Sequence, residues 1–464
     1  MTVTPRYPHL AFVLTLCVVV ALVWAWQPNP LVVVALCLLP VATLYVLNQT
    51  FWLVLLFVVF SFFRIHEAIP QLYSLKIPLL LSFGALAALG WHLIITRQLK
   101  PYWHPVMNWL VAFWLVVVIG LFFAGNRGVA FGAFSSVYWK IMVMTLAIMW
   151  LVTSAKHLNI ISITITLSGL LIGCVALSNA MQGIGLVEGS RVTIGRDLGS
   201  MLGDPNDLAL VLMFPFAFSV SLSFHRRTHL VVRLLAGVTC AILFLALLET
   251  QSRGGLLGAM AVLGYFANKT IRNKTVLILL GCVASLLLYA VAGISERASG
   301  GAAEEGIDAS AMGRLYAWEA AFKMALAHPL LGVGLQNFYY NYFFYSPHWD
   351  GLNHAVHSTW FGVLAETGFV GLTLFIGLIV CLIKTSLHSI RQIHRQTPTA
   401  IDIAANAVFA GLLGTIVSGT FLTQGFTWPI YILAALTIAI SHIIKIDSQN
   451  ENASTPAQQQ TLSY

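Results

Sequence analysis

Residues 205–249 read PNDLALVLMFPFAFSVSLSFHRRTHLVVRLLAGVTCAILFLALLE. Two apolar runs, 205–224 and 230–249, flank the short basic segment HRR. Each run has the roughly 20 residues that an α-helix needs to cross a bilayer. Basic residues in short loops of membrane proteins face the cytoplasm. This stretch therefore predicts two membrane-spanning helices joined by a cytoplasmic loop.

The composition extends this interpretation to the whole chain. Of the 464 residues, 59% are hydrophobic and only 9% are charged, against about 25% charged residues in soluble domains. These values exclude a soluble enzyme, a disordered protein and a nucleic-acid-binding module. The 24 Lys+Arg exceed the 16 Asp+Glu and give a net charge of +8. In a membrane protein this excess is better explained as an orientation signal than as a nucleic-acid footprint.

The apolar segments predict an all-α polytopic membrane protein with about twelve to fourteen transmembrane helices. Three of the fourteen candidates are short, and one pair of them is alternatively a re-entrant hairpin, which would leave twelve spans. The candidates are residues 10–26, 30–47, 50–63, 77–96, 105–124, 137–153, 160–182, 205–224, 230–249, 253–267, 275–293, 358–383, 402–420 and 427–444.

The basic residues of the short loops place both termini in the cytoplasm. Most acidic residues then fall on or near the outer face, which we interpret as a sign of function on that side. We divide the chain into N-terminal transmembrane helices, central transmembrane helices with an arginine-bearing periplasmic loop, a long periplasmic loop, C-terminal transmembrane helices and a disordered cytoplasmic tail. The ranges are 1–183, 184–293, 294–357, 358–446 and 447–464.

The long loop, 294–357, has internal structure. Its first part, 295–306, is predicted to be flexible, and 310–328 has helical spacing that ends at Pro329. An apolar stripe along this helix predicts an amphipathic helix lying at the membrane surface. The stripe consists of Leu315, Trp318, Phe322 and Leu326.

Arginines near the outer face are candidate phosphate ligands, because the planar guanidinium binds two phosphate oxygens at once. Arg253 lies where two spans meet, in TQSRGG; snorkelling or pairing with Glu249 is the alternative role. Arg191 and Arg196 lie in a short outer loop. Arg314 is a supporting candidate, for which stacking on a nearby aromatic ring is the structural alternative.

Histidines just before the span at 358 are candidate proton acceptors. A histidine has an ordinary pKa near 6.5, so the neutral ring of His357 or His354 accepts a proton near neutral pH. Glu366, inside the span, is expected to have a structural role. Asp204 is predicted to be a helix N-cap, with Asp207 in the first turn. We expect no metal and no cofactor; the 6 cysteines lie in apolar runs without CxxC spacing.

Three segments together resemble a known family. They are residues 250–255 (TQSRGG), 313–338 (GRLYAWEAAFKMALAHPLLGVGLQNF) and 357–368 (HSTWFGVLAETG). With the outer loop and the DPN at 204–206, they resemble the bacterial O-antigen ligase and O-antigen polymerase superfamily. The similarity is best over residues 185–375, whereas the N-terminal third is similar only in being apolar and helical.

The resemblance implies a C-type integral-membrane glycosyltransferase of the bacterial inner membrane with a periplasmic site. Family members take a glycan from undecaprenyl pyrophosphate and transfer it, without a metal, to lipid A core, another lipid-linked glycan or a protein hydroxyl. Carried over, Arg253 matches the serine-arginine-glycine motif, His357 the histidine before the late span, and Arg191 or Arg196 the outer-loop arginine. Ser358 stands where the family often has Asn, and the second histidine, His354, leaves the base assignment open.

We therefore expect an O-antigen-ligase-like transferase in which arginines hold the diphosphate while a histidine activates the acceptor hydroxyl. Back-side attack on the anomeric carbon would invert its configuration. The expected partners are the lipid-linked donor, the lipid A core, glycan or protein acceptor, and membrane lipids, without nucleic acid. The nearest alternative is an O-antigen or exopolysaccharide polymerase. A transporter or flippase of lipid-linked glycans is less favoured, because the ionisable residues gather at one face and no internal repeat is visible.

Overall fold

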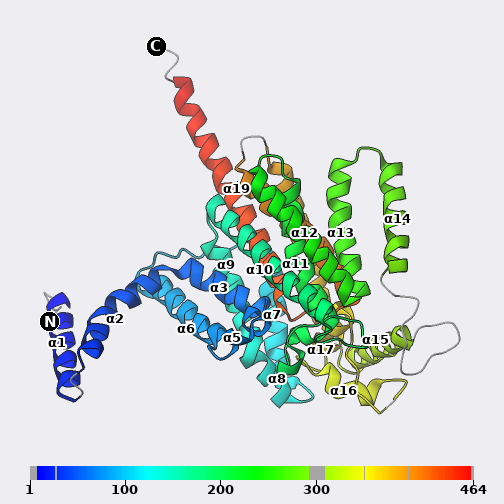
Figure 1. The fold of residues 1–464 in the computed structure, drawn as a ribbon, viewed down its shortest axis with the longest axis horizontal. Coiled ribbons are helices and arrows are strands. Elements are labelled where there is room, and N and C mark those ends of the chain that lie inside the picture. Colours follow the sequence, from blue (N-terminus) through cyan, green and yellow to red (C-terminus); the bar gives the residue numbers. More distant parts are fainter. Residues whose placement is uncertain (1–7, 27–28, 292–308, 350, 395–396, 461–464) are drawn as a thin grey trace.

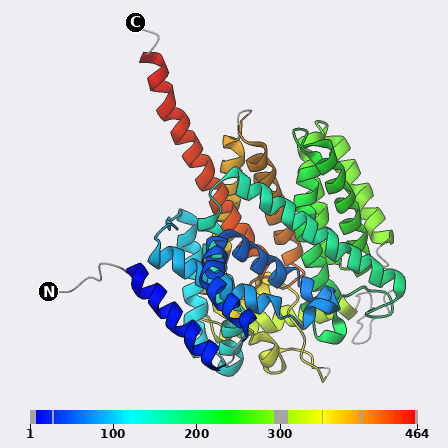
Figure 2. The same cartoon turned by 60° about the vertical axis from the view of Figure 1, so that its left-hand side comes forward.

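The structure, a computed structural model, describes residues 8–26, 29–291, 309–349, 351–394 and 397–460. Regular secondary structure in these residues is helical, apart from an isolated bridge between Val187 and Arg191. Most helices pack side by side in a bundle, and the two N-terminal helices project from it (Figure 1, Figure 2). The predicted all-helical fold class is confirmed.

The α-helices follow one another with short connections over most of the chain. They are α1 Pro8–Trp26, α2 Pro30–Asn48, α3 Thr50–Phe62, α4 Ile65–Ala68, α5 Pro70–Tyr73, α6 Ile77–Gly90, α7 Pro105–Phe123, α8 Arg127–Ala133, α9 Trp139–Leu151, α10 Ala155–Gln182, α11 Pro205–Phe224, α12 Leu230–Thr250, α13 Arg253–Thr270, α14 Lys274–Val291, α15 Ala309–Ala327, α16 Phe338–Tyr345, α17 Thr359–Gln392, α18 Thr399–Gly419 and α19 Trp428–Gln460. Two short π-helical segments adjoin α-helices: α6 is extended by η1 Trp91–Ile95, and α9 is preceded by η2 Phe134–Tyr138. Two short 3-10 helices precede α11, namely η3 Arg196–Leu198 and η4 Met201–Gly203.

Among the described residues, ten helical segments are long and apolar enough to cross a membrane. The predicted spans at 10–26, 50–63 and 275–293 correspond to shorter apolar segments, and the one at 253–267 corresponds to α13. The ten segments are Pro30–Asn48, Gln71–Ile95, Pro105–Phe123, Arg127–Leu151, Ala155–Gln182, Pro205–Phe224, Leu230–Thr250, Thr359–Gln392, Thr399–Gly419 and Trp428–Gln449.

Helix α11 forms the centre of the bundle. It is apolar on all sides, and nearly all of its residues are buried, as expected for a helix surrounded by others. Its neighbours are α10, α12, α13 and α18. Because α11 is enclosed, its first turn has a fixed position, and that turn lies at the end of the bundle where the polar residues discussed below converge.

Helix α17 is interrupted at Gly368, whose backbone has φ 69° and ψ −170°. The loop that follows α15 packs into this break: Phe369 N donates to Pro329 O (2.8 Å) and Val333 N donates to Ala365 O (2.8 Å). These bonds satisfy backbone groups that an interrupted helix would leave without partners. The break therefore attaches the loop that follows α15 to the first turns of α17.

Replacing Gly368 with alanine is expected to destabilise the protein. The residue has a left-handed backbone, and an added Cβ would lie 2.5 Å from Pro329 O. We expect a loss of at least about 1–3 kcal/mol, measured as a lower melting temperature of the detergent-solubilised protein. Gly264→Ala in α13 is the matched control, because nothing lies within 4 Å of its added Cβ. An unchanged melting temperature for Gly368→Ala would contradict the role of the break.

The predicted helix in the long loop is confirmed as α15. Small side chains, among them Ala317, Ala320 and Ala321, form its buried face, and α15 packs against α17. From the predicted apolar stripe, Leu315 and Leu326 are 47% and 59% exposed. Trp318 and Phe322 lie against the rings of Phe361 and Phe369 in α17. The alanines allow the close approach of the two helices. The predicted flexible part at 295–306 lies outside the described residues.

The C-terminal segment differs from its prediction. Residues 447–460, predicted to be disordered, continue α19 as a helix to Gln460.

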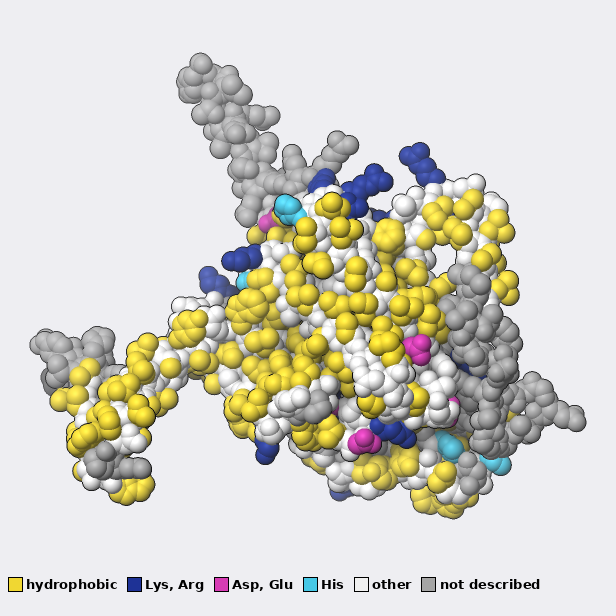
Figure 3. Space-filling view, viewed as in Figure 1, with side chains coloured by type: hydrophobic (Ala, Val, Ile, Leu, Met, Phe, Trp, Pro, Cys, Tyr) yellow, Lys and Arg dark blue, Asp and Glu magenta, His cyan; other side chains and the backbone are white. Residues whose placement is uncertain are grey.

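Hydrophobic side chains cover the middle of the bundle, and lysines and arginines gather at one end (Figure 3). This distribution is that of a protein that spans a membrane.

Candidate functional site

Polar residues from four segments surround a cavity of about 360 Å³ at one end of the bundle. The segments are the first turn of α11, the loop before α16, the start of α17 and the loop between α18 and α19. Their polar lining residues are Asp204, Asn206, Asp207, Gln336, His357, Thr359, Glu366, Thr423 and Thr427. The sequence placed several of these on the outer side, and the fold brings them around one space.

His357 lies in the wall of this cavity with a left-handed backbone, at φ 45°. Such a conformation costs a residue with a side chain about 1–3 kcal/mol and persists where the surroundings fix it. Here both neighbours are fixed: Val356 O accepts a bond from Trp318 Nε1 (3.1 Å), and Ser358 caps the N-terminus of α17. Strained backbone of this kind is concentrated at functional sites.

The surroundings of His357 favour its neutral form. Burial lowers the pKa of the imidazole below its ordinary value of 6.5, and the positive charge of Arg314 lowers this pKa further. Asp204 opposes the shift, and His354 and Arg191 add smaller effects in the same direction as Arg314. The ring is therefore available to accept a proton at neutral pH.

Arg191 is buried beside the cavity. Its Nε donates to Thr250 O (3.2 Å), and its Nη2 donates to Asn206 Oδ1 (3.1 Å). Its Nη1 lies 3.9 Å from Glu188 Oε1. Arg196, in contrast, is exposed in η3, and its Nη1 donates to Gly203 O (3.2 Å). Of the two predicted outer-loop arginines, Arg191 is the one bonded to a residue of the cavity wall.

The first turn of α11 supplies the acidic part of the wall. Asp204 is the predicted N-cap, and its Oδ1 accepts bonds from Asn206 N (2.7 Å) and Asp207 N (3.3 Å). Asn206 Oδ1 also accepts a bond from Ser252 Oγ (2.9 Å). The amide of Asn206 thus joins two segments to α11: the loop between α10 and α11 that carries Arg191 (the arginine loop), and the TQSRGG segment.

Arg253 is the first residue of α13, and Ser252 caps this helix. A Cβ at Gly254 would lie 3.1 Å from Leu422, which lines the cavity, and a Cβ at Gly255 would lie 2.6 Å from the Ala209 Cβ in α11. The glycines thus allow close packing of α13 against its neighbours. Arg253 therefore begins its helix beside the cavity, at the same end of the bundle as His357.

Comparison with known protein families gives a match over part of the chain. The profile of a family described as O-antigen ligase matches residues 238–376. Residues 238–376 are thus similar to the O-antigen ligase family. The matched region extends from α12 to the middle of α17 and contains Arg253, Arg314, His357 and Glu366, so the resemblance seen in the sequence is confirmed. A search of curated proteins found no match.

Within the matched region, Glu366 has a structural contact. Its Oε2 accepts from Gln336 N (2.8 Å), and its Oε1 accepts from Phe338 N (3.3 Å) at the start of α16. The carboxylate thus holds the loop that carries Gln336 against α17. His354 lies against the ring of Tyr342, with ring centroids 5.4 Å apart. Trp318, four residues after Arg314, stacks on Phe361 with centroids 5.1 Å apart.

Some contacts of the site were missed in the sequence. Glu67 Oε2 pairs with Arg64 Nε (3.0 Å) and accepts a bond from Ser200 Oγ, which ties the arginine loop to α4. Gln336 lines the cavity with a left-handed backbone, at φ 55°. No local signal predicts the bond between Glu67 and Ser200, because these two residues are far apart in the sequence. In the described part of the chain, no group of three or more His, Cys, Asp or Glu side chains is arranged around a metal position.

Proposed function

We propose that the protein is an O-antigen-ligase-like glycosyltransferase. It moves a glycan from undecaprenyl pyrophosphate to a hydroxyl of lipid A core or of a protein, at the periplasmic face of the bacterial inner membrane. The observation that carries this proposal is the position of His357, neutral and on the wall of a polar cavity, beside buried and flanking arginines. The match to the O-antigen ligase family supports the same class of enzyme.

The reaction follows from the chemistry of the wall. The acceptor oxygen attacks the anomeric carbon, and its proton passes to the neutral ring of His357. The bond between the anomeric carbon and the diphosphate oxygen breaks, and the diphosphate leaves with the electron pair. Attack from the side opposite the leaving group inverts the configuration of the anomeric carbon. This step needs no further reactant.

The charges around the cavity suggest separate positions for the two parts of the donor, the sugar and the diphosphate. The lining itself is acidic, with Asp204, Asp207 and Glu366, and suits sugar hydroxyls better than phosphates. Arg191, Arg253 and Arg314 flank the cavity and would hold the diphosphate at its rim. Fixed guanidinium groups stabilise the negative charge that builds up on the leaving group, without having to reorganise.

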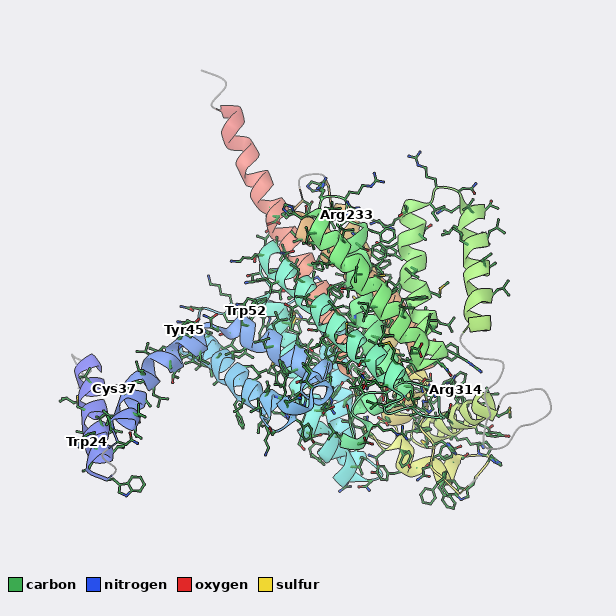
Figure 4. The ribbon with its side chains drawn as sticks, viewed as in Figure 1. Trp24, Cys37, Tyr45, Trp52, Arg233 and Arg314 are labelled. Atoms are coloured by element: carbon green, nitrogen blue, oxygen red, sulfur yellow. The ribbon has the colours of Figure 1, made fainter. Side chains whose placement is uncertain are left out.

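The orientation of the bundle supports a periplasmic site. Arg314 and Arg233 lie at opposite ends of the bundle (Figure 4). Arg233 belongs to the end whose short loops are rich in basic residues, which is the cytoplasmic end by the positive-inside rule. The cavity beside Arg314 would then open toward the periplasm, where lipid-linked glycans are presented.

Deletion of the gene distinguishes the acceptors. Loss of all glycan-capped lipid A supports a ligase, and a bare secreted protein supports protein glycosylation. Capping of lipid A by a single repeat unit would assign the protein as a polymerase, which shares the family. Accumulation of donor on the cytoplasmic face would instead support a flippase. Complementation with wild type and with His357→Ala in parallel shows whether the phenotype depends on the cavity.

The charges around His357 predict the pH dependence of transfer. Activity falls at acidic pH as the ring is protonated, with a midpoint below 6.5 because the pKa is lowered. Arg314→Gln removes a positive charge and raises this pKa, so the fall in activity at acidic pH (the acidic limb of the profile) moves to higher pH. Asp204→Asn removes a negative charge, lowers the pKa and moves the limb to lower pH, while asparagine still caps α11.

The measurement is the transfer rate against pH for the three proteins, with folding checked by melting temperature. Shifts in opposite directions are expected. If both variants shift the limb in the same direction, or neither does, His357 is not the group that accepts the proton.

A further inference from the structure

A second charged cavity lies at the end of the bundle opposite the site. It is open, has a volume of about 690 Å³, and is formed by the end of α11, the loop to α12, the first turn of α12 and the end of α13. Its charged lining residues are all basic: Arg226, Arg233 and Lys269. None of these residues takes part in the proposed transfer reaction.

Two of the three cations of this cavity, Arg233 and Lys269, are held in place by the fold. Arg233 Nε donates to Ser223 O (3.4 Å), at the end of α11. Lys269 Nζ donates to Asn406 Oδ1 (2.6 Å) and lies 5.6 Å from the centre of the Tyr265 ring. The neighbouring acidic residue, Asp402, is paired with His225, whose Nε2 lies 3.0 Å from Asp402 Oδ2. With three basic residues against this one carboxylate, the cavity keeps a net positive charge.

We propose that this cavity binds the phosphate of an anionic phospholipid. A tetrahedral phosphate suits two guanidinium groups and an ammonium group converging on one space, because each arginine can contact two oxygens. Basic cavities between membrane helices on the cytoplasmic side are known positions for anionic headgroups.

The surface next to the cavity favours a lipid over a free phosphate. Immediately beyond Arg226, the start of α12 exposes Leu230, Val231 and Leu234, which are 65%, 67% and 60% exposed. Phe224, in the cavity wall itself, is 52% exposed. An acyl chain lying along α12 would cover these side chains while its headgroup occupied the cavity. A free phosphate would leave the apolar face without a role.

The test is a lipid titration of the full-length protein in detergent, followed by native mass spectrometry. The probes are phosphatidylglycerol, phosphatidylcholine with the same acyl chains, and inorganic phosphate. We expect the first phosphatidylglycerol to bind at least about tenfold more tightly than phosphatidylcholine. The reason is that each basic residue near the surface adds a favourable contribution to the binding of an anionic headgroup. Inorganic phosphate is expected to displace it only weakly.

The variant R226Q/R233Q/K269Q is expected to lose this preference. The matched control R227Q/R272Q/K274Q removes the same charge from the same end of the protein but outside the cavity lining, and it should keep the preference. If the triple variant does not fold, R226Q alone replaces it in the test, because this substitution changes an exposed residue. R226Q should lose part of the preference for phosphatidylglycerol.

Three results would overturn the proposal: equal binding of both lipids by the wild type, retention of the preference in R226Q/R233Q/K269Q, or displacement of phosphatidylglycerol by inorganic phosphate at comparable concentrations. The last would assign the cavity to a free phosphate. The His357→Ala protein should retain the preference, which separates this inference from the proposed reaction.

Discussion

Replacement of His357 with asparagine is expected to lower the rate of glycan transfer by about 10²–10⁴-fold, the usual contribution of a positioned general base. Asparagine adopts the left-handed backbone of this position more readily than other residues with side chains, so the fold should persist. It cannot accept the proton at neutral pH. His357→Ala should lose activity to the same extent. The measurement is transfer by membranes that contain equal amounts of each protein.

The control for this prediction is the neighbouring histidine. His354→Ala removes an imidazole of the same segment that lies against the Tyr342 ring, and we expect it to retain most of the activity. Loss of transfer in the His354 variant, with normal transfer in both His357 variants, would exchange the two roles. Full activity of all three variants would remove the imidazole from the mechanism.

Replacement of Arg253 with alanine is expected to reduce transfer by about 10²–10³-fold, the typical effect of removing one charge-stabilising group from an active site. The motivation is the position of this arginine at the start of α13, beside Leu422 in the cavity wall. Arg253→Lys keeps the charge but loses the planar fork, so partial activity is expected. The assay should vary the concentration of the lipid-linked donor, because a diphosphate ligand affects both donor binding and the chemical step.

Arg196→Gln is the matched control for Arg253. It removes one positive charge from the same end of the molecule, from an exposed side chain bonded to Gly203 O. We expect nearly normal transfer. Equal losses in the Arg196 and Arg253 variants would mean that general attraction of the anionic donor, and not a specific contact, accounts for the effect; added salt would then remove the difference from wild type.

The features that the sequence predicted well are local ones. The apolar run at 205–224 corresponds to α11, and Asp204 forms the predicted cap, because span length and capping depend on adjacent residues. The spacing at 310–328 likewise predicted α15. The motif TQSRGG lies between two apolar runs, which predicted that Arg253 stands where two helices meet, and Arg253 is the first residue of α13.

The features that the sequence could not predict depend on tertiary contacts. Arg191 and Arg196 are equivalent in the sequence, and the fold distinguishes them: Arg191 is buried and bonded to Asn206, whereas Arg196 is exposed. The left-handed backbone of His357 could not be predicted, because histidine adopts it more often than most residues with side chains but still only in a small fraction of cases. The spacing of α15 identified its apolar stripe, but it could not show that the alanines of the helix also pack against α17.

The central claim is that one cavity brings a diphosphate-linked glycan together with a hydroxyl and a neutral imidazole. The most direct test is transfer by the purified protein from a synthetic polyprenyl-pyrophosphate-linked glycan to an acceptor alcohol. We predict release of one polyprenyl pyrophosphate for each glycoside formed, with an inverted anomeric centre, and loss of both products in His357→Asn. Retention of configuration, or transfer that proceeds unchanged in His357→Asn, would contradict the account.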